Sequence, residues 1–133
     1  MKNFILIVGI VALLVSVSLV APSCGSGGRK GPDTLKVNTT SIGAAVIGYN
    51  GPTPLEISVS QGKITGIKAL PNQETPRYMQ RVLESGLLER LDGKTLEEAA
   101  QTKLDAVTGA TFTSEAMIQN IRLGLEQATK DQN

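Results

Sequence analysis

The sequence predicts a small α+β domain, in which an antiparallel β-meander packs with about three α-helices. Runs that alternate apolar and polar residues between turn signals predict strands in the middle of the chain. Helix start and stop signals dominate the second half, and the last helical segment is amphipathic. A chain of 133 residues has room for one such domain.

Three strands are expected in sequence order, over residues 44–49, 55–60 and 63–70. The second run alternates strictly and places Leu55, Ile57 and Val59 on a buried face. An Asn-Gly pair and a Gln-Gly pair provide the turn signals, and the third run has a less regular period. Short turns between sequential strands imply an antiparallel meander.

Two short helices should follow the strands. Thr75 and Pro76 form a helix start for residues 77–85, and Gly86 ends that helix. A capping box, in which Thr95 is followed three residues later by Glu98, predicts a second helix over residues 96–101.

The last helix is expected from Ser114 onward. Its apolar residues fall on one stripe that should pack on the core, namely Met117, Ile118, Ile121, Leu125 and Ala128. The residues expected to lie largely off this stripe are Asn120, Arg122, Glu126 and Gln127.

The N-terminal part is interpreted as a leader and a linker. Residues 1–23 have the layout of a secretory signal peptide: a basic start, an apolar run from Phe4 to Val20, and small residues at the end. An uncleaved membrane anchor is the alternative, because the run lies at the lower edge of spanning length. Residues 24–40, rich in Gly, Ser and charge, then form a flexible linker, and residues 41–133 form the folded domain.

Cys24 is the one cysteine of the chain, so no intramolecular disulfide can form. The residues before it resemble a bacterial lipobox, in which the cysteine becomes the lipidated first residue of the mature protein. This resemblance implies a lipid anchor at Cys24, and a membrane-anchored protein that faces the periplasm or the cell exterior. A free thiol in a disordered tail is the alternative.

Charge and composition narrow the function. The formal net charge of +1 becomes zero when the leader with Lys2 is removed, and the chain has no basic cluster, which gives no support for nucleic-acid binding. The chain has no histidine to activate a serine or threonine nucleophile. After the leader only Tyr49, Tyr78 and Phe112 are aromatic. Tyr49 and Phe112 are expected in the core, with packing against a cofactor ring as the alternative.

The most informative segment runs from Asp105 to Ser114 and combines an acid, a glycine and four hydroxyls just before the last helix. Free N–H groups and the dipole at a helix N-terminus favour a phosphate group, and a hydroxyl can be esterified to one. Thr111 should stand two or three residues before the first helical turn, and Asp105 could hold a metal ion or position a hydroxyl. The alternative is a plain helix cap, because Ser, Thr and Gly are common there.

This segment resembles the flavinylation motif of the FMN-binding domain family. That family includes the periplasmic flavin-carrying subunits of the sodium-pumping NADH:quinone reductase and of the Rnf complex. In it, a flavin transferase takes FMN from FAD, with magnesium, and links it by a phosphoester to the last threonine of a Ser/Thr-Gly-Ala-Thr core. The resemblance implies that Thr111 carries covalent FMN. The other residues that match the motif are Asp105, Thr108, Gly109, Ala110, Thr113 and Ser114.

The resemblance extends upstream to Glu74 and Thr75, which are similar to the family's Glu-Thr-Pro segment. That segment is thought to lie against the flavin, so the resemblance implies cofactor contacts for both residues. The alternative for Glu74 is a favourable interaction with the dipole of the helix that follows. The resemblance covers about residues 44–127, most of the predicted domain.

The leading hypothesis is therefore an exported, lipid-anchored flavoprotein that passes electrons between redox partner proteins, within or outside a membrane oxidoreductase complex. It would be a redox carrier domain or an oxidoreductase subunit rather than an enzyme by itself, because no acid–base pair for substrate chemistry stands out. The alternative is a colourless ligand-binding or interaction lipoprotein, in which Thr-Gly-Ala-Thr only caps a helix.

Overall fold

The computed structural model describes residues 33–133. The predicted signal peptide and the lipid anchor at Cys24 fall outside these residues. Within the described part of the chain, no helix combines the length and the apolar character needed to cross a membrane.

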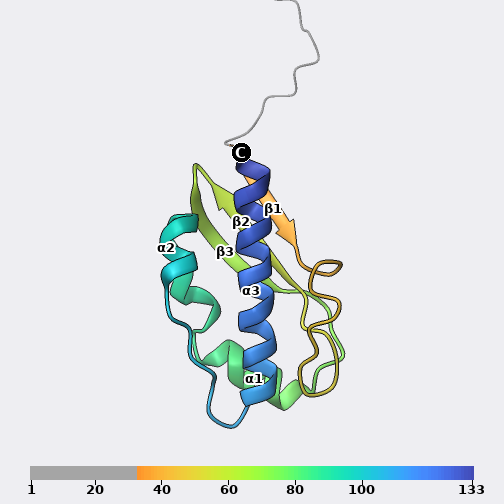
Figure 1. Cartoon of the computed structure of the whole chain (residues 1–133). Helices are drawn as coiled ribbons and strands as arrows, with labels where there is room; N and C mark the ends of the chain where they lie inside the picture. Colours follow the sequence, from red (N-terminus) through yellow and green to blue (C-terminus); the bar gives the residue numbers. More distant parts are fainter. Residues whose placement is uncertain (1–32) are drawn as a thin grey trace, which may run out of the picture. The chain divides into compact units, whose positions relative to one another are not determined.

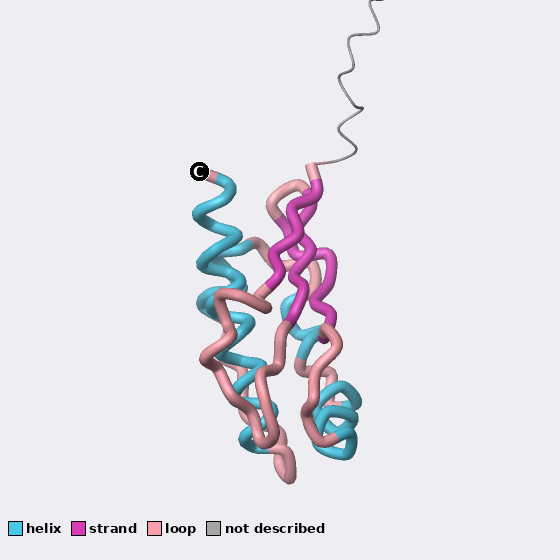
Figure 2. The backbone as a smooth tube through the Cα atoms, turned by 90° about the vertical axis from the view of Figure 1, so that its right-hand side faces the viewer, coloured by secondary structure: helices cyan, strands magenta, loops and turns pink. Residues whose placement is uncertain are grey.

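A three-stranded antiparallel sheet and one long helix form two layers (Figures 1 and 2). The strands β1 (Thr34–Asn38), β2 (Leu55–Ser60) and β3 (Lys63–Ala69) lie in the order β1-β2-β3. Helix α3 (Thr111–Gln132) runs along one face of this sheet and contacts β1 and β2. The predicted α+β fold, with a meander and a C-terminal helix, is confirmed.

Smaller helices complete the domain. Helix α1 (Pro76–Glu84) packs against α3, the 3-10 helix η2 (Leu88–Leu91) packs against β3, and α2 (Leu96–Gln101) packs against α3. The sequence predicted α1 to within one residue and α2 at its observed bounds. The capping box of α2 is complete, since the Glu98 N–H donates to Thr95 Oγ1 at 3.2 Å and the Thr95 N–H donates to Glu98 Oε2 at 2.9 Å. Helix η2 was not predicted.

The irregular period of β3 has a structural cause. Ser58 pairs with Gly66 and Val59 pairs with Ile64, so Thr65 is an extra residue on β3 and forms a β-bulge. The bulge shifts the alternation by one residue. Ile64 is buried before it, whereas Ile67 packs against the core after it.

The prediction for the first strand was wrong. Residues 44–49 form turns and one isolated bridge between Ile47 and Pro52, whereas β1 lies inside the stretch predicted as linker. The folded domain therefore begins before residue 41. β1 is an edge strand with one buried side chain, Val37, which pairs with Ile57 of β2. Its own pattern is weak because pairing with β2, and not local propensity, makes it a strand.

Helix α3 supplies the largest part of the core. All five residues of its predicted stripe are buried, but Asn120, expected off the stripe, is also fully buried. Its side-chain amide donates to Thr53 Oγ1 at 3.2 Å and to the Ala116 carbonyl at 3.1 Å, so the polar group is partly satisfied. The core is otherwise aliphatic, and Tyr78 packs only at its margin.

Candidate functional site

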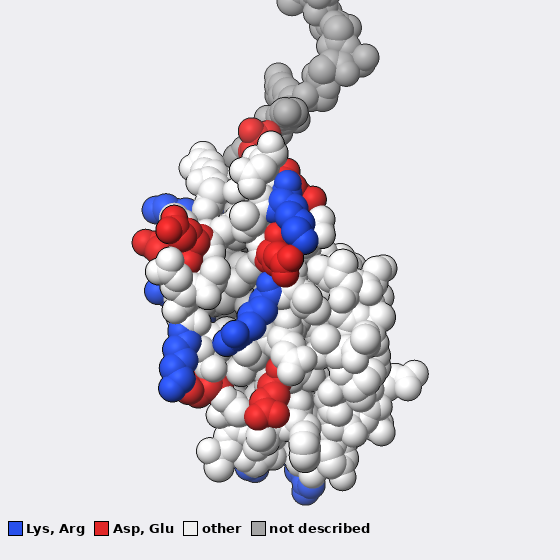
Figure 3. Space-filling view, in the orientation of Figure 1, with Lys and Arg blue, Asp and Glu red and all other residues white. Residues whose placement is uncertain are grey.

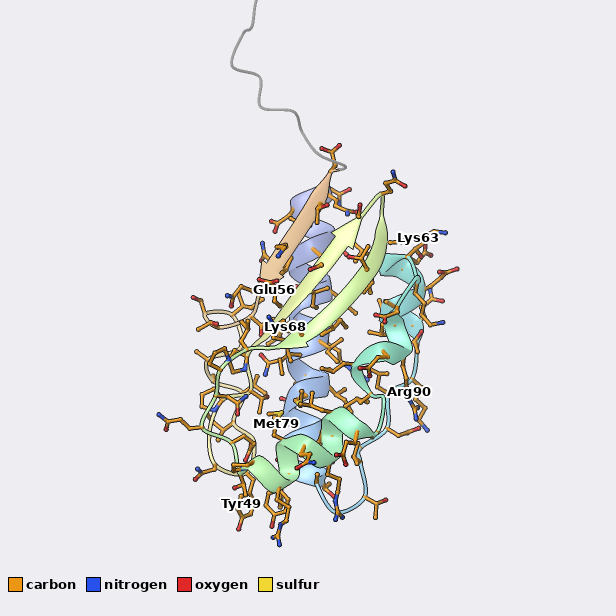
Figure 4. The ribbon with its side chains drawn as sticks, turned by 180° about the vertical axis from the view of Figure 1, so that it is seen from behind. Tyr49, Glu56, Lys63, Lys68, Met79 and Arg90 are labelled. Carbon is orange, nitrogen blue, oxygen red and sulfur yellow. The ribbon has the colours of Figure 1, made fainter. Side chains whose placement is uncertain are left out.

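The three aromatic residues of the described chain meet at one open pocket of about 220 Å³. It lies at the lower end of the domain, where Figure 1 shows α1 beside the start of α3 and Figure 4 labels Tyr49. The pocket is lined by Tyr49, Tyr78, Gly109, Ala110, Thr111, Phe112 and Thr113. The ring centroids of the two tyrosines are 4.9 Å apart, with an interplanar angle of 75°, which is an edge-to-face contact.

Tyr49 and Phe112 are not core residues, and the expectation that they would be buried was wrong. Tyr49 is 59% exposed and Phe112 is 66% exposed. Tyr49 stands on the turn between β1 and β2, and Phe112 stands on the first turn of α3, on the side away from the sheet-facing stripe. Neither residue belongs to the aliphatic core, so both rings are free to line the pocket.

Thr111 is the first residue of α3, not a residue before it, and its side chain is exposed at the pocket. The first helical hydrogen bond runs from the Ser114 N–H to the Ala110 carbonyl at 2.9 Å. The three N–H groups before it, from Thr111 to Thr113, donate to no other group of the described chain. They leave the electrostatically positive end of the helix open toward the pocket.

The motif does not cap α3 with a side chain. The residue at the N-cap position is Ala110, and no side chain accepts a capping hydrogen bond there. Thr108 is exposed on the preceding turn. The interpretation of Thr-Gly-Ala-Thr as a helix cap therefore loses its physical basis, because capping requires an acceptor on a side chain at the helix start.

Ser114 holds the turn in front of α3. Its Oγ accepts a hydrogen bond from the Val107 N–H at 2.8 Å and donates to the Ala110 carbonyl at 2.8 Å. Ser114 is fully buried and does not line the pocket, so its role is to shape the turn. Thr113 is 1% exposed, and its Oγ1 has no hydrogen-bond partner within residues 33–133.

Glu74 positions the Tyr49 wall of the pocket. The side chain is 5% exposed, and its Oε2 accepts a hydrogen bond from the Tyr49 N–H at 2.9 Å. Its Oε1 accepts from the N–H groups of Asn50 and Thr75, each at 3.0 Å. The turn approaches so closely that a Cβ on Gly48 would overlap Glu74 Oε2. Both carboxylate oxygens are occupied by backbone, so the residue acts through the turn that it holds.

Asp105 lies apart from the aromatic pocket. Its carboxylate pairs with Lys103 Nζ at 3.4 Å on the surface. It lines a different pocket, together with Glu115 and Arg122. No group of three or more potential metal ligands occurs among the described residues. The structure thus brings Thr111, Gly109, Ala110 and Thr113 together at one pocket, but leaves Asp105 outside it.

Sequence reasoning missed two residues of α1. Tyr78 forms a wall of the pocket, and the guanidinium of Arg81 packs against Gly109 beside it. The two residues are three positions apart, which places them on one face of a helix. That spacing was visible in the sequence, but nothing local shows that this face turns toward the start of α3.

A family model described as FMN-binding domain matches residues 48–126, more than half of the chain. The match begins at the turn held by Glu74 and ends within α3, so it includes every residue that lines the aromatic pocket. No curated protein matches the chain. The chain therefore belongs to the FMN-binding domain family and is a flavin-binding protein.

Proposed function

We propose that the protein is an exported electron carrier that holds FMN through a phosphoester on the hydroxyl of Thr111. One observation supports this proposal above all: an exposed hydroxyl, an open helix N-terminus and all three aromatic rings of the described chain meet at one pocket. Aromatic side chains contribute strongly to a small core when buried. Their placement around a pocket instead suits a flat, aromatic ligand.

The size of the pocket favours a covalent link. At about 220 Å³ it is smaller than the roughly 300–1,000 Å³ typical of sites that enclose a drug-sized ligand, so it accommodates part of a flavin. A phosphoester keeps the ring at high effective concentration, and weak contacts with the aromatic residues are then sufficient to orient it. When bound, FMN supplies the redox chemistry, and the protein supplies position.

A flavin transferase makes the link from FAD with magnesium, as the family resemblance implies. The oxygen of Thr111 forms a bond to the phosphorus of the FMN half, and the pyrophosphate bond of FAD breaks. AMP leaves, and the proton of the hydroxyl passes to a base on the transferase. The exposed position of Thr111 on the first turn of α3 suits delivery by a separate enzyme.

The arrangement of the domain suits an anchored carrier. The described chain begins at the end of the domain where α3 finishes, whereas Thr111 lies at the other end of this helix (Figure 1). The 22 residues of α3 span about 33 Å. The described chain thus begins at the end opposite Thr111, which suits access of redox partner proteins to a flavin on that residue.

The decisive experiment is production of the full chain together with a flavin transferase, followed by denaturing-gel fluorescence and intact mass. We expect a fluorescent band and a mass gain equal to FMN less one water. The variant T111A should lose both signals, and T40A, which removes an exposed hydroxyl outside the motif, should keep them. A chain without the mass gain, or a gain that persists in T111A, would disprove the proposal.

A further inference from the structure

The guanidinium of Arg81 lies against the motif that contains Thr111. Arg81 comes from α1, and its guanidinium packs against Gly109, two residues before Thr111. A Cβ on Gly109 would overlap Arg81 Nη1 and would lie 3.2 Å from Cζ. Gly109 also has a φ of 82°, which a residue with a side chain rarely adopts. The glycine of the motif therefore makes room for the cation.

The charge of Arg81 has no partner within residues 33–133. The three ion pairs in this part of the chain are all made by lysines. The nearest carboxylates along the chain are otherwise engaged: Glu74 accepts from backbone N–H groups, and Glu84 accepts from Gln80. On the face shown in Figure 3, basic side chains appear at the lower tip of the domain, where α1 and the start of α3 lie.

A second observation at the same place points to a ligand. Thr113 lines the pocket and is 1% exposed, yet its Oγ1 finds no hydrogen-bond partner within the described chain. A buried polar group without a partner is uncommon in native structures. The N–H of the same residue is one of the three that α3 leaves free, so residues 111–113 carry donors without an acceptor in the described chain.

We propose that Arg81 is the counter-cation of the phosphate on Thr111 and a positioning residue for the flavin. The inference rests on the proposed attachment of FMN to Thr111. A phosphate that bridges threonine and flavin carries one negative charge, and a guanidinium presents a planar set of donors that fits phosphate oxygens. The free N–H groups at the start of α3 would supply further donors to the phosphate. Together they direct the flavin chain from Thr111 toward the aromatic pocket.

A thermodynamic cycle with two changes tests this role: loading with FMN and the substitution R81Q. The full chain and its variant are each produced with and without a flavin transferase. Circular dichroism in urea then gives the unfolding constant of each of the four proteins, since the chain has no tryptophan. We expect R81Q to raise the unfolding constant of the loaded protein about 2- to 5-fold more than that of the unloaded protein.

Two variants and one condition separate the proposed contact from a general charge effect. R90Q removes an arginine of η2 that Figure 4 places away from Tyr49, and it should show no coupling to FMN. R81K keeps the charge but loses the planar set of donors, so it should keep only part of the coupling. Added salt should weaken the coupling, because Arg81 is exposed to solvent and its interaction with the phosphate is screened.

The outcomes distinguish this inference from the proposed function. If the wild-type chain takes up no FMN, both the proposed attachment to Thr111 and the role of Arg81 are contradicted. If the wild-type chain is loaded but the coupling of R81Q to FMN is no larger than that of R90Q, only the role of Arg81 is contradicted. If R81Q does not fold, the cycle with R81K decides the matter, because equal unfolding constants for Arg and Lys in the loaded state contradict recognition by the guanidinium.

Discussion

Glu74 Oε2 accepts a hydrogen bond from the N–H of Tyr49 at 2.9 Å, and this contact joins two segments 25 residues apart. It fastens the turn between β1 and β2 to the residues that enter α1. The ring of Tyr49 is thereby held in edge-to-face contact with Tyr78 of α1. A buried carboxylate that accepts only backbone N–H groups thus positions one wall of the aromatic pocket without lining it.

Replacement of Glu74 by glutamine should destabilise the domain by about 1–3 kcal/mol. Both carboxylate oxygens accept from backbone N–H groups, so an amide NH2 in either orientation leaves at least one N–H without an acceptor. The free energy of unfolding in urea measures the loss. E84Q is the matched control, because Glu84 accepts only from Gln80 at the surface. An equal loss in both variants would contradict the clamping role of Glu74.

Replacement of Phe112 by alanine should separate flavin packing from stability. The ring is 66% exposed, so the unfolding free energy should change by no more than about 0.5 kcal/mol. The flavin fluorescence anisotropy of the FMN-loaded protein should fall, because the flavin ring loses its contact with one wall of the pocket. Ile47, which is exposed but does not line the pocket, provides the control I47A. Unchanged anisotropy in F112A would show that Phe112 does not contact the flavin.

Removal of the neighbouring hydroxyls of Thr113 and Ser114 should have different effects on the unfolding free energy. S114A should cost about 1–3 kcal/mol of unfolding free energy, because the Val107 N–H loses its acceptor. T113V should leave the unfolding free energy of the unloaded protein nearly unchanged, since Thr113 Oγ1 has no hydrogen-bond partner among residues 33–133. Thermal unfolding of both variants checks the pair. A large loss in T113V would indicate a hydrogen bond that the structure does not contain.

Glu98 should make the stability of the domain depend on pH. The backbone N–H of Thr95 donates to its carboxylate and holds the pKa of Glu98 below its ordinary value of 4.5, and the Thr95 hydroxyl and nearby lysines act in the same direction. Because the pKa is lower in the folded state, the contribution is present above 4.5 and is lost as the pH falls through the folded-state pKa.

The comparison of wild type with E98Q, from pH 7 down to pH 3, measures this contribution. The stability difference should shrink below about pH 4.5, since protonation then abolishes the charge that the variant lacks. E97Q changes a carboxylate of the same first turn that takes no part in the capping box, and should leave the profile of wild type unchanged. A difference between wild type and E98Q that is constant with pH would contradict this account.

Local signals in the sequence predicted much of the fold. The alternation of β2, the capping box of α2 and the apolar stripe of α3 each depend on residues a few positions apart, and all were confirmed. β1 could not be predicted in the same way. Its short pattern has one buried side chain, and it becomes a strand only because β2 offers an edge for pairing.

For the candidate site, the sequence by itself determined the hydroxyl-rich motif, the Glu-Thr-Pro segment and the small number of aromatic residues. These are properties of composition and short spacing, and they were enough to indicate the family. Only the tertiary structure decided that Tyr49, Tyr78 and Phe112 leave the core and share one pocket. It also decided that Glu74 holds a distant turn and that Arg81 packs on Gly109. Such contacts join segments that lie far apart in the chain, and they depend on tertiary packing, which no local preference of the backbone indicates.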